Sequence, residues 1–308
     1  MKKSVLMFAM LLLGSLLHAQ SVLLLPSDAA SLGYANTSLT AEVTASAAEY
    51  NPSALVFSPS KMAVGAGYGL WLPSVSSASL LSAGGWYHGR TWGGGLQVKR
   101  LGMEAYVPTN ENGVASQIED PFKPSELTVS LGAGFALGHN FSVGATLRLI
   151  SSSLGNNAKA ISFNADISAC YDNGPLRAAV KMGNLGPKLK FNEEDSSAQP
   201  TLFSAGVSYG IVAGLRAQVQ ADYLFAGSFM AGLGAAYCWR NMLSARAGYH
   251  LGTGTYGTQS YASAGLGVRF VGVSLDAAYV FLGENLRNTF LITLSYTLPS
   301  RSATTGNY

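Results

Sequence analysis

Apolar and polar residues alternate strictly in the stretch Phe141-Ser142-Val143-Gly144-Ala145-Thr146-Leu147-Arg148-Leu149. Every odd-numbered position is apolar, and the positions between hold serine, glycine, threonine and arginine. A period of two predicts a β-strand with one apolar and one polar face. The same period returns at 215–225, 243–251 and 290–298. The same alternation along the rest of the chain predicts fourteen strands, over 61–72, 78–88, 90–101, 125–137, 141–154, 158–171, 175–184, 201–210, 213–225, 228–239, 242–251, 258–270, 272–282 and 287–298.

The composition favours a membrane barrel over a soluble sandwich, which would show the same period. Charged residues are only 11% of the chain, and 36 residues are glycine. The segments are near ten residues long, as tilted strands that cross a bilayer must be. Aromatic residues gather toward the segment ends, as in interfacial girdles; they are Trp71, Trp86, Tyr87, Tyr209, Tyr237, Trp239, Phe270, Tyr279 and Phe281. Because hydrocarbon tolerates only helices and closed barrels, the pattern predicts an all-β, transmembrane antiparallel β-barrel of about 14 strands.

The first 19 residues have the features of a secretory signal peptide. Lys2 and Lys3 precede an apolar run from Val5 to Leu17, and the small residue Ala19 marks a cleavage point. The run is too short to span a bilayer comfortably. We therefore expect export and insertion into the outer membrane of a Gram-negative bacterium. Without Lys2 and Lys3 the chain has 17 basic and 16 acidic residues, so charge gives no reason to expect a nucleic acid partner.

Residues 20–60 lack the alternation. Ser27 to Ala48 is rich in alanine, serine and threonine, and Asn51-Pro52 and Pro59 interrupt regular structure. Small residues and low charge favour a hatch that packs inside the barrel, and the alternative is a loosely ordered periplasmic arm. The predicted organisation is therefore a signal peptide (1–19), a hatch (20–60), a barrel (61–298) and a C-terminal tail (299–308).

Several motifs resemble the PorV/PorQ family across the mature chain. They are Asp28-Ala29-Ala30-Ser31-Leu32-Gly33, Tyr50-Asn51-Pro52-Ser53-Ala54-Leu55, Phe122-Lys123-Pro124, 141–146, Gly183-Asn184-Leu185-Gly186-Pro187-Lys188 and Asn285-Leu286-Arg287-Asn288-Thr289. The family's Asn-Pro-Ala-Gly-Leu appears here with Ser53 and Ala54 in place of alanine and glycine. The resemblance implies a FadL-like barrel with an N-terminal hatch. Its hatch motif, formed by Asn51, Pro52, Ala54 and Leu55, would either bind a ligand or have a structural role.

The resemblance also implies a function in type IX secretion in Bacteroidetes. Such a protein is not an enzyme, needs no cofactor, and receives exported proteins at the cell surface. Its expected partners are outer-membrane lipid and the type IX translocon, exported cargo proteins or surface-attachment proteins, contacted through loops 102–124 and 185–200. The alternative is a FadL-like transporter of small hydrophobic molecules. A transporter would have an apolar pocket near Asn51 to Phe57, and a break in a strand, for which the glycines at 65–69 and 93–95 are candidates.

The polar strand faces carry charges that we expect to line the lumen. They are Arg148, Asp166, Arg177, Lys181, Arg216, Asp222, Arg246, Arg269 and Asp276. A neutralising network that braces a filled barrel is the favoured interpretation, and a polar path through a channel is the other. Period two fixes the face on which a charge lies and leaves its purpose open.

Catalytic and metal-binding motifs have little support. Gly206-Val207-Ser208-Tyr209-Gly210 fits a nucleophile elbow, but the helix that an elbow requires is not predicted after it. Gly252-Thr253-Gly254-Thr255-Tyr256-Gly257 resembles a dinucleotide fingerprint and is predicted as a flexible loop. The histidines His88, His139 and His250 lack metal-ligand spacing, and solvation would explain His139 and His250. Cys170 and Cys238 are expected to be free thiols.

Overall fold

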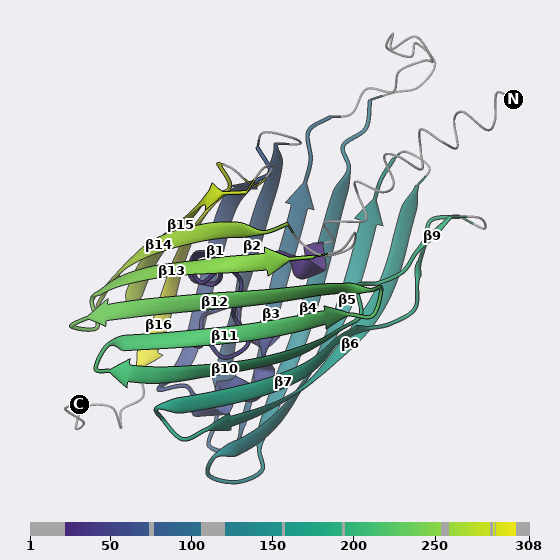
Figure 1. Cartoon of the computed structure of the whole chain (residues 1–308). Helices are drawn as coiled ribbons and strands as arrows, with labels where there is room; N and C mark the ends of the chain where they lie inside the picture. The colour runs from purple at the N-terminus through teal and green to yellow at the C-terminus, as the bar shows by residue number, and fades with distance from the viewer. Residues whose placement is uncertain are drawn as a thin grey trace, which may run out of the picture.

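Fourteen antiparallel strands close into a barrel (Figure 1). The computed structural model describes residues 22–73, 77–105, 121–155, 158–192, 195–253, 259–283, 286 and 288–299. The barrel strands are β1 (Ser60–Trp71), β2 (Ala78–His88), β3 (Trp92–Gly102), β4 (Ser125–Ala136), β5 (Phe141–Ser153), β6 (Lys159–Asp172), β7 (Leu176–Leu185), β10 (Leu202–Val212), β11 (Leu215–Leu224), β12 (Ser228–Trp239), β13 (Leu243–Gly252), β14 (Tyr261–Phe270), β15 (Val273–Leu282) and β16 (Phe290–Pro299). The predicted fold class is confirmed, and each strand begins and ends within three residues of its predicted bounds.

The strand faces are inverted relative to a soluble protein. Leu147 and Phe163 point outward and are 63% and 65% exposed, whereas Thr146 and Asn164 point inward and are buried. The outward apolar band suits hydrocarbon, and the inward serine, threonine, asparagine and glycine residues suit a crowded lumen. The period of two therefore specifies both faces of the wall.

The two ends of the barrel differ in the length of their connections. One end has tight turns, including Arg240-Asn241 and Val271-Gly272, in which all four residues have positive φ. Two central residues with positive φ are typical of type I′ hairpins, which suit the strand twist. The opposite end carries the longer connections, and 186–201 forms a small hairpin of β8 (Leu189–Lys190) and β9 (Ser196–Ser197). Most of predicted loop 102–124, and Glu193 and Glu194, lie outside the described residues, as do 1–21, 254–258 and 300–308.

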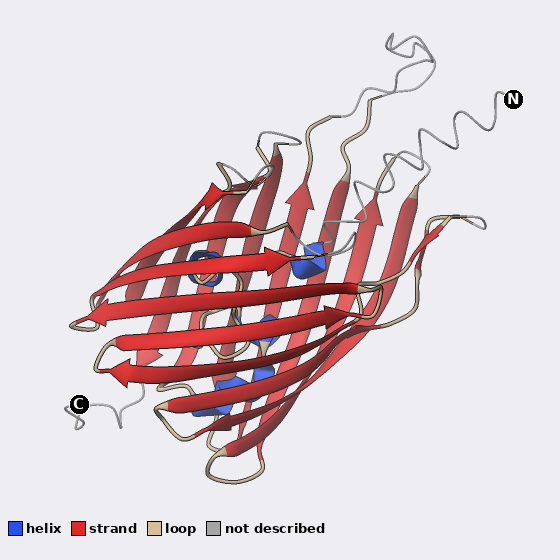
Figure 2. Cartoon of the chain, viewed as in Figure 1, coloured by secondary structure: helices blue, strands red, loops and turns tan. Residues whose placement is uncertain are grey.

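The N-terminal segment lies inside the barrel (Figure 2). It contains η1 (Val22–Leu24), α2 (Ala29–Gly33), α3 (Ala47–Tyr50) and η2 (Pro52–Phe57). Asp28 caps α2 by accepting a hydrogen bond from the Ser31 N–H at 2.7 Å. α2 contacts β13 to β16, whereas α3 and η2 contact strands from β2 to β6. The hatch therefore touches both halves of the wall. No helix among the described residues is long and apolar enough to cross a membrane.

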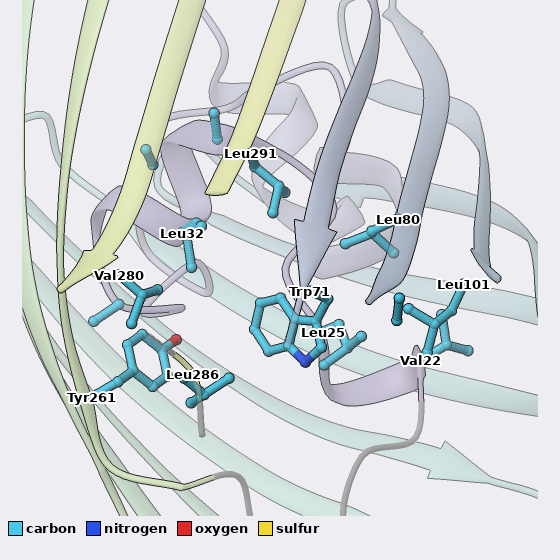
Figure 3. Close-up of a cluster of buried hydrophobic side chains, with 14 residues drawn as sticks. Val22, Leu25, Leu32, Trp71, Leu80, Leu101, Tyr261, Val280, Leu286 and Leu291 are labelled. Carbon is cyan, nitrogen blue, oxygen red and sulfur yellow. The ribbon is translucent and has the colours of Figure 1, made fainter. Parts of the chain in front are cut away.

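The hatch begins at the long-loop end and reaches β1 at the short-turn end. Val22 and Leu25 pack with Trp71, Leu80 and Leu101 in an apolar cluster at the long-loop end (Figure 3). Leu32 joins the same cluster beside Val280, Tyr261, Leu286 and Leu291. The rest of the hatch runs through α3 and η2 toward the short-turn end, where β1 starts at Ser60.

Three predictions about individual side chains are wrong. Trp71 and Trp86 were expected in the interfacial girdles, but both are buried inside, and the Trp86 indole donates to the Thr44 carbonyl at 2.6 Å. His250 was expected to be solvated, but it is buried and stacked on Tyr261 with 5.0 Å between ring centroids. The error has one cause: the interior is filled by the hatch, so inward side chains meet protein instead of water.

Candidate functional site: the plugged lumen

Glycines on the wall bring the hatch backbone into direct contact with the strands. A Cβ atom at Gly132 would lie 2.1 Å from the Ala48 carbonyl oxygen, and one at Gly134 would lie 2.1 Å from that of Pro52. On the next strand, a Cβ at Gly144 would lie 2.5 Å from the Ser53 nitrogen. Real Cβ atoms do not approach this closely, so only glycine fits at this contact. The hatch is therefore packed against the wall without an intervening layer of side chains.

The predicted motif residues Asn51, Pro52, Ala54 and Leu55 form the turn into η2. Asn51 donates through Nδ2 to the Leu39 carbonyl at 2.8 Å and accepts from the Ser53 hydroxyl. Pro52 occupies the first turn of η2, where its missing N–H costs nothing. Ala54 and Leu55 are buried, and Leu55 packs beside Trp86. A cavity beside Asn51 and Ala54 measures about 10 Å³, which holds at most one water molecule.

Lys99 and Glu49 form a buried ion pair between β3 and the hatch. The Lys99 Nζ lies 2.8 Å from the Glu49 Oε1, and the two side chains are 1% and 4% exposed. Lys99 also donates to the Leu25 carbonyl at 3.0 Å, and the Ser27 hydroxyl donates to Glu49. Burial raises the pKa of Glu49, but the Lys99 and Arg148 cations lower it by more, so the pKa lies below the ordinary value. One carboxylate thus joins two parts of the hatch to the wall.

A second anchor joins the hatch to the opposite wall. Arg246 on β13 donates to Asp276 on β15 at 2.6 Å, and its other nitrogens donate to Glu42 of the hatch. Burial raises the pKa of Glu42, while the Arg246 guanidinium lowers it by more, and the net pKa is below the ordinary value. Burial also raises the pKa of Tyr34, whose ring lies under Arg246. The two anchors hold the hatch from both sides.

Arg148 and Asp166 belong to a buried network beneath the 186–201 connection. Arg148 lies 3.1 Å from the Asp166 carboxylate and donates to Asn184 at 2.9 Å. Asn164 donates to Gln199 at 2.7 Å, and Gln199 in turn donates to the Pro187 carbonyl at 2.7 Å. The network therefore connects the lumen to both ends of the β8–β9 connection.

Four of the remaining predicted lumen charges have separate hydrogen-bond partners. Arg177 pairs with Asp172 at 2.6 Å and donates to the Ala41 carbonyl. Arg216 donates to the Ser208 hydroxyl at 3.0 Å, and Arg269 donates to Asn241 at 3.4 Å. Asp222 accepts from Gln220 at 3.0 Å. The structure brings Arg148 to Asp166 and Arg246 to Asp276, whereas the four charges with separate partners and the half-buried Lys181 of β7 do not join one continuous path.

The chemical motifs occupy structural positions. Ser208 lies within β10, donates to the Thr40 carbonyl at 2.9 Å, and is followed by a turn into β11. Cys170 and Cys238 are free. In the part of the chain that the structure describes, no group of three His, Cys, Asp or Glu residues could hold a metal ion. Most of the 252–257 motif lies outside that part.

Sequence reasoning missed Lys99, Glu49 and Glu42. Lys99 has the expected signal, because it alternates with Val98 and Leu96 and so lies on the polar face of its strand. Glu49 and Glu42 lie in a segment without periodicity, where nothing in the sequence indicates which strand lies opposite. Their roles follow from the position of the hatch.

The fold and the plugged lumen define an outer-membrane β-barrel whose interior is filled by its own N-terminal segment. The sequence matches the family model for the type IX secretion system protein PorV over residues 15–223. The chain therefore belongs to the PorV family, and this membership associates it with type IX secretion. No curated protein sequence matches the chain.

Solved structures share the fold at low sequence identity. The Ralstonia pickettii toluene transporter TbuX has a TM-score of 0.66 at 11% identity, over 88% of this chain and 98% of that one. The Pseudomonas putida toluene transporter TodX has a TM-score of 0.60 at 12% identity, over 84% and 95%. A Pseudomonas aeruginosa FadL homologue has a TM-score of 0.57 at 13% identity, over 90% and 99%. These likenesses show the FadL-like fold.

Proposed function

We propose that the protein is a type IX secretion component that binds exported proteins at its long-loop end and shuttles or anchors them at the cell surface. The filled lumen carries this proposal. The hatch lies directly on the glycines of the wall and is held by two ion pairs, the buried Lys99–Glu49 pair and the Arg246–Glu42 pair, in which the arginine is buried. With the interior occupied in this way, the surface available to a large partner is the outside of the molecule, where the loops lie. In this role the lumen charges brace the barrel, and the hatch motif is structural.

The β8–β9 connection is the best-supported contact element. Its base is fixed by Gln199 and Asn184, which are both buried in the network around Arg148. Above that base, Pro187, Lys188 and Lys190 are exposed. A rigid base lowers the entropic cost of ordering a contact loop when a partner binds. The arrangement therefore supports recognition of a folded protein by this connection.

The rival function is transport of small hydrophobic molecules, as the printed names of the toluene transporters suggest for those proteins. Two features weigh against it. The cavity beside Asn51 is about 10 Å³, far below the roughly 300–1,000 Å³ of small-molecule sites. The glycines at 65–69 and 93–95 lie in continuously paired strands, so the break that a lateral exit would require is not found at either candidate segment.

A pull-down from the native outer membrane in mild detergent tests the proposal. Mass spectrometry of proteins and of lipids is run on the tagged protein and on two variants. Lys188→Glu alters the exposed β8–β9 connection, and Lys61→Glu makes the same charge change at the exposed short-turn end. We expect translocon subunits or exported proteins with the native chain and with Lys61→Glu, and fewer with the loop variant. Recovery of the barrel with only a stoichiometric fatty acid would overturn the proposal in favour of transport.

A further inference from the structure

The lipid-facing wall contains a hollow of about 840 Å³ across β6, β7 and β10 to β13. A closed barrel presents a convex wall to its surroundings, so a hollow on its outside needs a local cause. The cause lies in the outward side chains. Ala205, Ala221 and Ala231 form its floor and are only half-buried, as expected for small groups on an outward face.

Strand register places these alanines side by side. Ala205 pairs with Ala221, and Ala221 pairs with Ala231, on three consecutive strands. On the other side, Ala205 pairs with Val180, which pairs with Ala169. The floor therefore runs across five neighbouring strands. Bulkier outward residues stand in the adjacent rows, with Phe203, Tyr223 and Phe229 on one side and Val207, Val219 and Leu233 on the other.

The chemistry of the hollow is apolar. Its outward side chains are aliphatic or aromatic and carry no charge. The Gln220 side chain, although its strand contributes to the hollow, is directed into the lumen, where it donates to Asp222 and accepts from the Leu39 N–H. An occupant must therefore be recognised by shape and apolar contact. The volume lies within the range of sites that hold small ligands.

We propose that this hollow, named here the outer groove, binds an acyl chain of a membrane lipid as a retained, ordered ligand. The groove is continuous with the outward apolar wall, where Phe203, Phe229 and Leu251 are exposed to the bilayer. Acyl chains are thus the molecules that already cover its edges. A chain of methylene groups also needs no polar partner, which agrees with the lining. The site is separate from the hatch and from the long loops, so it does not depend on the function proposed above.

Native mass spectrometry of the full chain tests this assignment. The protein is reconstituted with dipalmitoyl phosphatidylethanolamine, extracted in maltoside detergent, and titrated with detergent until bound lipid is lost. Ala221→Phe fills the groove floor. Ala83→Phe adds the same ring to an exposed outward alanine on β2, outside the groove. Migration of unheated samples in SDS gels verifies that each variant is folded.

We expect one lipid to be retained by the native chain and by Ala83→Phe. Ala221→Phe should bind it at least about tenfold more weakly, because a ring in the floor displaces two or more buried methylene groups. Equal retention in all three proteins would overturn the proposal. It would also be overturned if the native chain emerged as a dimer that Ala221→Phe dissociates, because a second copy would then occupy the groove.

Discussion

The Lys99 ammonium lies in the interior of the molecule, where Glu49 supplies its counter-charge. The ammonium has the Glu49 carboxylate and the Leu25 carbonyl as partners, and both belong to the hatch. A buried ion pair gains little over apolar residues, but a single buried charge without its partner is costly. The ion pair therefore fixes the position of the hatch, because the wall is stable only when Glu49 lies opposite Lys99.

Glu49→Gln should destabilise the protein by about 3–5 kcal/mol, because it leaves the Lys99 charge buried without a counter-charge. The measurement is the free energy of unfolding in urea, in lipid vesicles, followed by intrinsic fluorescence. The double variant Glu49→Gln/Lys99→Met should recover much of the loss. Asp172→Asn, which opens the more exposed Arg177 pair at the barrel rim, should cost less. Equal losses in Glu49→Gln and Asp172→Asn would contradict a special role for the buried pair.

Acid should weaken the hatch anchors. The pKa values of Glu49 and Glu42 are lowered in the folded protein, whereas an unfolded glutamate has a pKa of about 4.3. A lowered folded pKa contributes stability above the unfolded pKa, and this contribution is lost as pH falls through the folded pKa. The unfolding free energy, measured from neutral pH downward, should therefore fall below about pH 4. A flatter profile is expected for Glu49→Gln, and identical profiles would be inconsistent with the anchor.

The sequence predicts well which face of a strand a side chain lies on, and poorly which side chain it contacts across the lumen. The alternation predicts that Arg148 and Asp166 face the lumen, and in the structure the two side chains lie 3.1 Å apart and are buried. Trp86 was misplaced because its inward side chain meets the hatch, and the sequence of its strand does not show that the lumen is filled there. Glu42 and Glu49 could not be assigned, because a partner across the lumen depends on the path of a segment that has no period.

At the scale of elements, the glycines of β3, β4 and β5 explain how an irregular segment fits a regular wall. Gly93, Gly134 and Gly144 are close in the paired strands, and each meets hatch atoms at its inner side. The strands themselves were predictable, because each needs only local alternation and a turn. The hatch helices α2 and α3 have five and four residues, too few to leave a helical period in the sequence.

Gly134→Ala should displace η2, since its Cβ would lie 2.1 Å from the Pro52 carbonyl oxygen. Overpacking of this kind costs about 1–3 kcal/mol. The unfolding free energy and the rate of hatch cleavage by chymotrypsin, which cuts after aromatic residues such as Tyr34, Tyr50 and Phe57, measure the effect in the folded protein. Gly94→Ala is the matched control. Gly94 lies on β3, which pairs with the strand of Gly134, and its Cβ would have no contact closer than 3.4 Å. If the two variants were equally stable, the close contact with the hatch would be refuted.

At the scale of the whole molecule, the filled lumen predicts a barrel that does not conduct ions. The native protein in a planar bilayer should give no measurable channel current. Removal of residues 22–58 should open a path lined by Lys99, Arg148 and Arg246, and current should appear. Samples are first verified as folded by their gel migration. A stable current through the intact protein would show that the hatch leaves an open route.

The order of the chain adds a consequence for biogenesis. The hatch comes before every strand, and it touches strands on both sides of the β1–β16 pair that completes the ring. A Cβ at Gly65 of β1 would lie 3.0 Å from Ala45, so the hatch reaches the closing strand itself. Had the ring closed first, the hatch would have to thread into a finished cylinder, which protein chains avoid. In the full chain we therefore expect the ring to close with the hatch already in place between its strands.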